Sequence, residues 1–243
     1  MFFQQKEYNI KCEWGLEGLD ALLDLSDVII IIDILSFSTC VDIITSNKSP
    51  VFPYLYKDES ALNFAKENNL ILAEKRNKDK ISLSPYSLIN IPKNSKILLP
   101  SPNGSTLSFY TNKAKKKLSV ICSCLRNFRA CAELAQEIGK NITIIPAGEK
   151  WNNNTTRFAI EDFLGAGAII SEIKSNSLSP ESFLALNSFN SVKNDIYQII
   201  KKSASGKELI EKGFEEDVKI ACELNASNNT PILYKDNDIF YYK

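Results

Sequence analysis

The stretch Val28-Ile29-Ile30-Ile31-Ile32-Asp33-Ile34-Leu35-Ser36-Phe37-Ser38-Thr39-Cys40 joins an apolar run to a carboxylate and several hydroxyls. The apolar run predicts a buried strand, and a helix is expected to begin near Ser38. Ligands of parallel α/β sheets bind at the carboxyl ends of the strands, where Asp33 would lie. Asp33 with Ser36, Ser38 and Thr39 suits a hydrated metal ion or an anionic ester. Helix capping by Asp33 and Ser38 is the alternative interpretation.

Strand-like and helix-like segments alternate along most of the chain. The alternation predicts the α/β class, with three α/β/α layers and a mixed, largely parallel sheet. The helical pattern becomes almost continuous from Arg157 to Leu224, which predicts a helix-rich C-terminal third. With no internal repeat and no long linker, residues 1–243 are expected to form one domain. The expected strands are Tyr8 to Glu13, Val28 to Asp33, Val51 to Tyr56, Leu70 to Ala73, Lys96 to Leu99, Leu118 to Cys122, Ile142 to Ile145, Pro231 to Tyr234 and Ile239 to Tyr242, and the expected helices before Arg157 are Glu17 to Leu25, Ser38 to Ser46, Asp58 to Asn68, Gly104 to Asn112 and Arg126 to Ile138.

The charge balance and the apolar segments limit the possible partners. The 29 basic and 29 acidic side chains cancel, so nothing indicates binding to nucleic acid or to an anionic membrane. No apolar run approaches the roughly 20 residues of a membrane-spanning helix. The first residues lack the basic-then-apolar pattern of a signal peptide, so a cytoplasmic protein is expected.

The absence of histidine excludes several kinds of catalytic site. Serine and cysteine nucleophiles activated by histidine are excluded, as are histidine-ligated zinc sites. The 6 cysteines contain no CxxC pair and are expected to be buried, reduced thiols. A bound metal ion would therefore have mainly oxygen ligands, which favours Mg²⁺ or Mn²⁺.

A second candidate site is the segment Pro100-Ser101-Pro102-Asn103-Gly104-Ser105-Thr106, which connects a predicted strand to a predicted helix. Backbone N–H groups at such a helix start bind anions, and the side chains of Ser101, Ser105 and Thr106 add donors. We therefore expect these residues, with Asn103 and Gly104, to hold a phosphate. A well-capped turn without a ligand is the alternative.

A third candidate site is Glu161-Asp162 at the start of a long predicted helix. Asp162 shares a helix face with Ala166 and Ile169, so its carboxylate is expected to point into packed protein. A buried carboxylate is costly unless it is paired or bound to a metal ion. Glu161 stands four positions after Arg157 and has a surface ion pair as its alternative role.

Positive groups follow two other predicted strands. Arg126-Asn127 comes after the strand ending near Cys122, and the planar guanidinium of Arg126 suits a phosphate or a carboxylate. Lys75 and Arg76 also follow a strand, although a solvated charge run explains them equally well. Glu149, Glu74 and Arg157 are further residues whose place in the site the sequence leaves open.

The ordered motifs resemble those of the 2-phosphosulfolactate phosphatase family. The motifs run from Ile32 to Thr39, from Pro100 to Ser105, from Cys124 to Asn127, from Pro146 to Glu149 and from Glu161 to Gly167, and later segments around Ser205 and Asp217 also fit. The resemblance implies an α/β/α fold, a homodimer and a Mg²⁺-dependent hydrolase. The implied substrate is a phosphate ester that also carries a carboxylate and a sulfonate, in coenzyme M biosynthesis.

One motif departs from the family pattern. Better-known members carry Asp-Val-Leu-Arg-Ala, whereas this chain has Asp33-Ile34-Leu35-Ser36-Phe37, so Ser36 replaces an arginine that is a plausible anion contact. The difference bears on the sulfonate half of the substrate. A different 2-phospho-hydroxyacid therefore stays open as the substrate.

The combined hypothesis assigns a role to each candidate. Asp33, Glu161 and Asp162 position Mg²⁺, and the Ser101–Thr106 segment holds the phosphoryl oxygens of a small anionic ester. Arg126 and Asn127 neutralise developing charge, while Asp33 or Cys40 is open as a covalent nucleophile. Two other classes remain as alternatives: a non-catalytic module that binds a phosphorylated metabolite, and a structural subunit whose polar strand ends are only caps.

Overall fold

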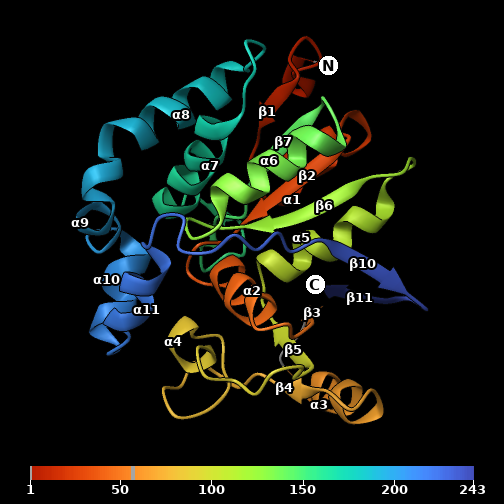
Figure 1. The fold of residues 1–243 in the computed structure, drawn as a ribbon, viewed down its shortest axis with the longest axis vertical. Coiled ribbons are helices and arrows are strands. Elements are labelled where there is room, and N and C mark those ends of the chain that lie inside the picture. The colour runs from red at the N-terminus through yellow and green to blue at the C-terminus, as the bar shows by residue number, and fades with distance from the viewer. Residues whose placement is uncertain (1, 56–57) are drawn as a thin grey trace.

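The computed structural model describes residues 2–55 and 58–243 and shows an α/β protein (Figure 1). The predicted class is confirmed, but its strands form two main sheets rather than one. Sheet A contains, in spatial order, β1 (Ile10–Cys12), β7 (Ile142–Pro146), β2 (Val28–Ile32) and β6 (Ser119–Ser123). Sheet B contains β10 (Leu233–Asp236), β11 (Ile239–Tyr242), β3 (Val51–Tyr54), β5 (Ile97–Pro100) and β4 (Ile71–Leu72). The expected strand end at Tyr56 lies outside the described residues.

Sheet A is wholly parallel, with β2 between β7 and β6. Alternate residues of β2 face opposite layers, as the period of a strand requires. Ile30 and Ile32 pack toward α6 (Phe128–Ile138) and α7 (Ile160–Glu172), whereas Ile29 and Ile31 pack toward α1 (Gly15–Leu22) and α5 (Gly104–Tyr110). A strand that is buried on both faces explains the continuous isoleucine run.

Sheet B is mixed, and α2 (Phe37–Ser46) separates it from sheet A (Figure 1). Cys40 and Ile44 of α2 belong to the same buried cluster as Ile97 and Leu99 of β5. β3, β4 and β5 are parallel, and the C-terminal hairpin β10–β11 adds antiparallel pairs. Its turn residues Asn237 and Asp238 both have positive φ. The chain before β10 also links the two sheets, because Ile232 forms an antiparallel bridge with Ile121 of β6.

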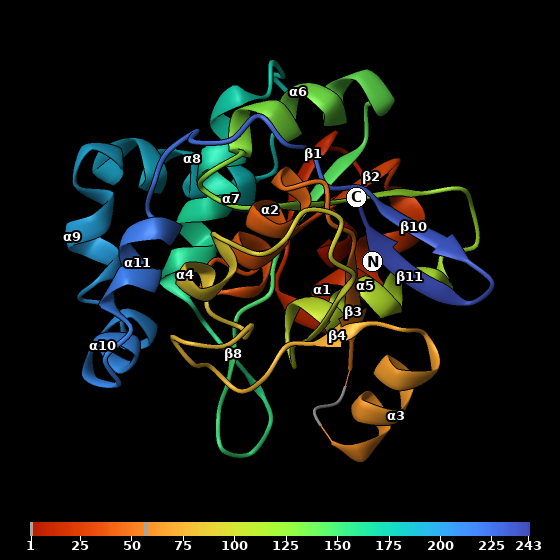
Figure 2. The same cartoon turned by 60° about the horizontal axis from the view of Figure 1, so that its bottom comes forward.

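The last third of the chain is mostly helical, as predicted. Gly167 permits a close crossing of α7 and α8 (Pro180–Val192), because a Cβ there would lie 2.1 Å from the Ala185 carbonyl oxygen. The short hairpin β8–β9 projects from the edge where the strands of sheet A end (Figure 2). The remaining elements are α3 (Glu59–Glu67), α4 (Pro85–Leu88), α8 (Pro180–Val192), α9 (Ile196–Ile200), α10 (Ala204–Glu211), α11 (Glu215–Ala221), β8 (Glu149–Lys150), β9 (Thr156–Arg157) and the 3₁₀ segments Phe2–Gln4, Leu23–Leu25, Thr111–Lys113 and Lys193–Asp195.

All 6 cysteines are free and buried, as predicted. None of the helices in the described ranges is long and apolar enough to cross a membrane.

Candidate active site

Asp33 lies directly after β2 and is 5% exposed. Its Oδ1 accepts a hydrogen bond from the Phe37 N–H at 3.2 Å, and its Oδ2 accepts one from the Gly104 N–H at 3.0 Å. The Ser101 hydroxyl lies 3.5 Å from Oδ2. The carboxylate therefore connects the end of β2 to the starts of α2 and α5.

The start of α5, where the sequence predicts a phosphate site, faces the Asp33 carboxylate in the structure. Gly104 directs its N–H at the Asp33 carboxylate, as a helix start does toward negative charge. A side chain at this position would place its Cβ 2.2 Å from the Phe37 ring, so only glycine allows the approach. The Gly104 N–H is consequently engaged, and its predicted contact with a phosphate stays a prediction.

Asp162 is 3% exposed in the first turn of α7, which confirms its predicted burial. The Ile34 N–H donates to its Oδ1 at 2.7 Å, and the Gly148 N–H donates to its Oδ2 at 2.9 Å. Gly148 has φ +68°, a conformation that favours glycine. Asp162 thereby joins the loops after β2 and β7 to α7, which gives it a structural role beside the predicted one in metal binding.

Two further carboxylates lie close to Asp33 and Asp162. Glu149 of β8 accepts a hydrogen bond from Asn103 Nδ2 at 3.1 Å. Glu161, beside Asp162, is 2% exposed and receives no hydrogen bond from any described residue. These four carboxylates form what we call the acidic group, namely Asp33, Glu149, Glu161 and Asp162.

Burial and mutual repulsion raise the pKa values within the acidic group. Burial raises the pKa of Asp33 to about 6, and the charge of Glu161 adds to this effect. Burial and the charge of Asp33 raise the pKa of Glu149 to about 7. Burial, followed by the charges of Asp33 and Glu161, raises the pKa of Asp162 well above its usual range. The site thus favours a bound proton or a cation.

Asn103 provides a buried oxygen that lacks a partner. Its Nδ2 donates to Glu149, while its Oδ1 is buried and has no hydrogen-bond donor. The opposite orientation of the amide would place Oδ1 against the Glu149 carboxylate, so Oδ1 is the atom left free. A buried acceptor without a donor is costly, and a cation or a water molecule would satisfy it.

The described residues contain no ready-made metal cage. No three or more His, Cys, Asp or Glu side chains of residues 2–55 and 58–243 are arranged to hold a metal ion. Mg²⁺, however, usually binds through one or two carboxylates together with water and substrate oxygens. Asp33, Glu161 and Asn103 carry oxygen atoms of the kind that Mg²⁺ prefers, and Mg²⁺ stays a proposal.

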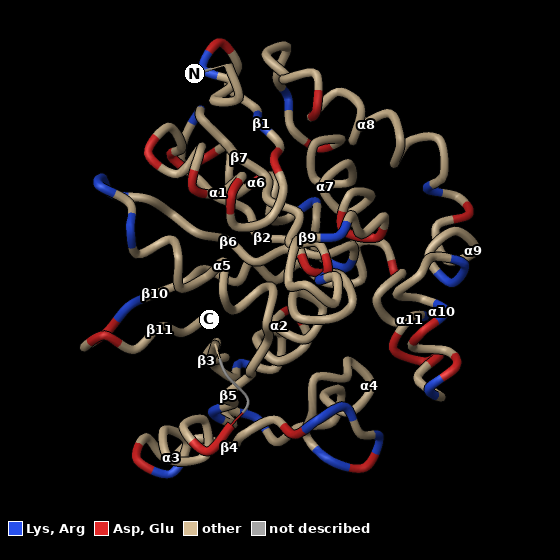
Figure 3. Tube along the Cα trace, turned by 180° about the vertical axis from the view of Figure 1, so that it is seen from behind, with Lys and Arg blue, Asp and Glu red and all other residues tan. Residues whose placement is uncertain are grey.

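A cavity of about 380 Å³ lies beside Ser101. Lys75 and Arg76, which follow β4, line this cavity, and the segment that carries them shows a run of blue between β4 and α4 in Figure 3. We call it the basic cavity and define it by Leu55, Lys75, Arg76, Leu83, Pro100, Ser101 and Pro102. Sequence reasoning gave Arg76 no role, because a solvated charge run has the same pattern.

Several predicted phosphate-binding hydroxyls make hydrogen bonds within the fold. Ser38 donates to the Asp33 carbonyl and Thr39 to the Ile34 carbonyl, each at 2.8 Å. Ser105 donates to the Leu99 carbonyl at 3.1 Å, and Thr106 donates to the Pro102 carbonyl at 2.8 Å. Among the predicted hydroxyls, Ser36 and Ser101 are the ones beside the basic cavity. The binding roles of all these residues stay predictions.

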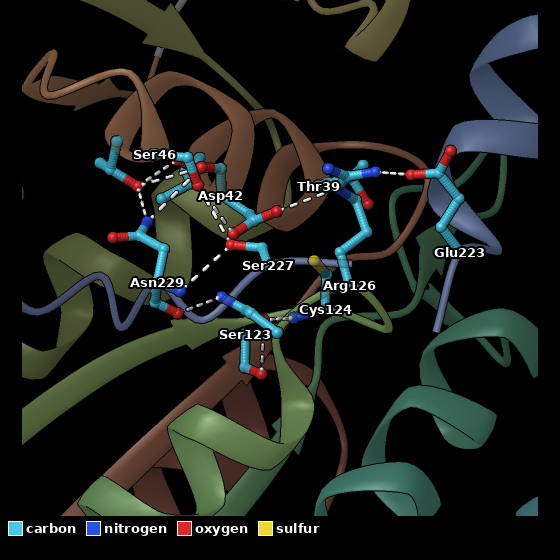
Figure 4. A network of polar contacts seen from close by, with 12 residues as sticks. Thr39, Asp42, Ser46, Ser123, Cys124, Arg126, Glu223, Ser227 and Asn229 are labelled. Atoms are coloured by element: carbon cyan, nitrogen blue, oxygen red, sulfur yellow. Dashed lines mark hydrogen bonds and ion pairs between the residues drawn. The ribbon is translucent and has the colours of Figure 1, made fainter. Parts of the chain in front are cut away.

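Arg126 belongs to a polar network with Asp42 and Glu223 (Figure 4). Its Nε donates to Asp42 Oδ2 at 3.0 Å, and its Nη1 pairs with Glu223. Asn127 accepts hydrogen bonds from Ser123 and from the Cys124 N–H. Neither residue contacts Asp33 within the described ranges, so their predicted contacts with a phosphate stay predictions.

The structure also places the residues that sequence reasoning left open. Glu149 belongs to the acidic group, whereas Glu74 is exposed and pairs with Lys80. Arg157 donates to Ser205 Oγ at 3.2 Å, and its charge lowers the pKa of Glu149. Cys40 is fully buried, and burial raises the pKa of its thiol, so it is a poor nucleophile.

Comparison with known proteins places the chain among phosphatases. A family model described as 2-phosphosulpholactate phosphatase matches residues 17–236. A Thermotoga maritima protein named probable 2-phosphosulfolactate phosphatase is 30% identical over 223 residues, which cover 88% of this chain and 91% of the relative. The Methanothermobacter thermautotrophicus protein named 2-phosphosulfolactate phosphatase is 27% identical over 219 residues, with 88% and 89% covered. Both the acidic group and the basic cavity fall within the matched region.

The raised pKa values predict that stability falls as pH rises. Asp33 and Glu149 keep protons in the folded protein up to about pH 6 and 7, whereas the unfolded chain releases them near pH 4. The folded state then holds more protons, so the free energy of unfolding decreases from about pH 4 to about pH 7. Each pKa unit is worth about 1.4 kcal/mol, or roughly 3–6 °C in Tm.

Thermal unfolding between about pH 5 and pH 8, with and without Mg²⁺, checks this prediction. Without divalent ions Tm should fall as pH rises, and Mg²⁺ should raise Tm more at the upper end. Glu149→Gln should flatten the profile, whereas Glu74→Gln, at an exposed carboxylate, should leave it unchanged. A Tm that is constant or rises over this range contradicts the assigned burial effects.

Proposed function

Because the chain belongs to the 2-phosphosulpholactate phosphatase family, we propose that it is a Mg²⁺-dependent phosphatase acting on the phosphate ester of a 2-phospho-hydroxyacid. The first candidate substrate is 2-phosphosulfolactate, which would yield sulfolactate and phosphate in coenzyme M biosynthesis. The observation that carries the proposal is the acidic group beside the basic cavity. The acidic group suits a hydrated cation, and the basic cavity suits an anionic ester.

The chain supplies an oxygen set that fits Mg²⁺. Asp33, Glu161 and the unpartnered Oδ1 of Asn103 are the oxygens that would hold the ion. When bound, Mg²⁺ would offset the charge of the phosphoryl oxygens and of the surrounding carboxylates. Asp162 would not bind the ion directly, since backbone N–H groups already donate to both of its oxygens. Its charge and its contacts with the loops would instead stabilise the site.

The chain's own residues would position the ester for attack by water. Ser101 lies between Asp33 and the basic cavity, where its hydroxyl can donate to a phosphoryl oxygen. Fixed backbone donors hold the Asp33 carboxylate, so it needs no reorganisation during the reaction. Hydrolysis forms a bond from the water oxygen to phosphorus and breaks the bond from phosphorus to the ester oxygen. The proton from the water must pass to a base.

Glu149 is the carboxylate that suits the role of this base. Its pKa of about 7 places proton uptake near neutral pH, and its hydrogen bond from Asn103 fixes the orientation of the carboxylate. The ester oxygen then takes a proton as the 2-hydroxyacid leaves. Direct attack by water agrees with the burial of Cys40, while Asp33 stays open as a covalent nucleophile.

A different 2-phospho-hydroxyacid is the second candidate substrate. Ser36 stands where better-known family members carry arginine, and this change alters the charge beside Asp33. The resemblance also supports a homodimer in the cytoplasm, and the mass of the assembled protein in solution would test the dimer. The non-catalytic alternative would bind the same esters without hydrolysing them.

Phosphate release from 2-phosphosulfolactate and 2-phospholactate, with Mg²⁺ and with EDTA, tests the proposed function. We expect release from at least one ester, which EDTA abolishes and added Mg²⁺ restores. Circular dichroism spectra recorded with Mg²⁺ and with EDTA should be the same, which would show that the protein stays folded in both conditions. Absence of release from both esters by the folded protein would refute the phosphatase and favour the binding module.

Asp33→Asn should reduce phosphate release by at least about 1,000-fold, because the variant loses the charge that supports the cation. The amide also turns one Asp33 acceptor into a donor, so some loss of stability is expected. Glu74→Gln is the matched control, since this carboxylate also follows a strand but is exposed and faces Lys80. Full activity of folded Asp33→Asn would exclude the assigned role.

Glu149→Gln should lower kcat by about 100-fold and remove the acidic limb of the pH profile. Below the pKa of Glu149, which a bound Mg²⁺ would lower from its value of about 7 in the free protein, the wild-type kcat should rise about tenfold per pH unit, because the base must lose its proton first. The pH dependence of kcat at saturating substrate checks this. An unchanged acidic limb in Glu149→Gln would assign the base to another group.

A further inference from the structure

Arg76 is held in the wall of the basic cavity by residues from distant parts of the chain. Its Nη1 pairs with Asp217 of α11, and its Nη2 donates to Ser36 Oγ at 2.9 Å. The guanidinium also lies over the Phe214 ring, 5.6 Å from the ring centroid. These contacts fix a side chain that is only 17% exposed.

Asp217 is itself fixed, so the position of Arg76 is set in advance. It is 1% exposed, and its Oδ1 accepts hydrogen bonds from Ser84 Oγ at 2.6 Å and from the Tyr86 N–H at 3.0 Å. Its Oδ2 is the oxygen that pairs with Arg76. A buried carboxylate with this many donors acts as a rigid support for the guanidinium.

Lys75, next to Arg76, adds a second positive charge to the basic cavity. It is exposed and has no ion-pair or hydrogen-bond partner in the part of the chain that the structure describes. A guanidinium has five N–H donors, and Asp217 and Ser36 occupy only part of them. The Lys75 ammonium and the remaining N–H groups of Arg76 are therefore available beside a cavity whose other walls are mainly apolar, from Leu55, Leu83, Pro100 and Pro102.

Ser36 connects this cavity to Asp33. Ser36 stands three residues after Asp33 in the chain, and its hydroxyl accepts a hydrogen bond from Arg76. The Arg76 guanidinium therefore lies against residue 36. The loop after β4 thus brings a positive group to the segment that follows Asp33.

We propose that Arg76, with Lys75, binds a second acidic group of the substrate, separate from the phosphate that reacts beside Asp33. The proposal rests on the proposed function and names the residues that would recognise the carboxylate or the sulfonate of its substrate. Ser101 lies at the border, since it lines the cavity and is 3.5 Å from Asp33 Oδ2. Arg76 is then a specificity-determining residue, and Asp217 is the residue that positions it.

A pair of esters that differ in one acidic group tests the proposal. 2-Phospholactate carries a carboxylate where isopropyl phosphate carries a methyl group. We expect wild-type kcat/KM to favour 2-phospholactate by about 100-fold, in line with charge-assisted hydrogen bonds from a fixed arginine. Arg76→Ala should lose most of this preference through a higher KM, while kcat/KM for isopropyl phosphate stays within about threefold.

Additional variants guard against a loss of folding in Arg76→Ala, which leaves buried Asp217 without its partner. Lys75→Ala removes an exposed, unpaired side chain and should reduce the preference about threefold to tenfold without affecting stability. Arg76→Lys should restore part of the preference, because it keeps the charge but loses the planar fork. Lys78→Ala is the matched control, since Lys78 also lies over Phe214 but does not line the basic cavity.

A binding measurement separates failure of this proposal from failure of the proposed function. Sulfolactate carries a carboxylate and a sulfonate but no phosphate. It should raise the Tm of the wild type but not that of Arg76→Ala. Absence of hydrolysis together with this shift would refute the phosphatase and support the acid site. Hydrolysis with equal losses on both esters, or with no loss on either, would overturn the assignment of Arg76.

Discussion

Hydrogen bonds from backbone N–H groups to two buried carboxylates organise the edge where the candidate site lies. Asp33 accepts from Phe37 and Gly104, and Asp162 accepts from Ile34 and Gly148. These donors come from the loops after β2 and β7 and from the starts of α2 and α5. Neither carboxylate can be lost without leaving buried N–H groups unpaired, which costs about 1–3 kcal/mol for each group.

The same arrangement concentrates negative charge where the chemistry is proposed. Glu149 and Glu161 lie close enough to raise the pKa values of their neighbours in the acidic group. The repulsion among these carboxylates destabilises the folded protein, and a cation bound between them would offset it. The basic cavity beside Ser101 supplies the complementary charge for an anionic ester. Binding of a cation would thus relieve the repulsion within the acidic group.

Local patterns in the sequence predict the positions of the carboxylates, but not the network around them. The apolar run before Asp33 and the helical spacing around Asp162 were enough to predict a strand end and a buried acid, and both are confirmed. The use of the Gly104 N–H by Asp33 depends on how α5 packs, and no local pattern encodes this. Arg76 was undervalued because its partner Asp217 lies 141 residues away. The division of the strands into two sheets likewise depends on tertiary packing, which local sequence patterns do not encode.

Amide hydrogen exchange at Ile34, Phe37, Gly104 and Gly148 would test most directly whether the two carboxylates hold this edge together. The structure predicts that these loop amides exchange as slowly as those inside β2, because each donates to a buried oxygen. It also predicts that Asp162→Ala speeds exchange at Ile34 and Gly148. Exchange as fast as that of exposed loop amides in the wild type would contradict the account.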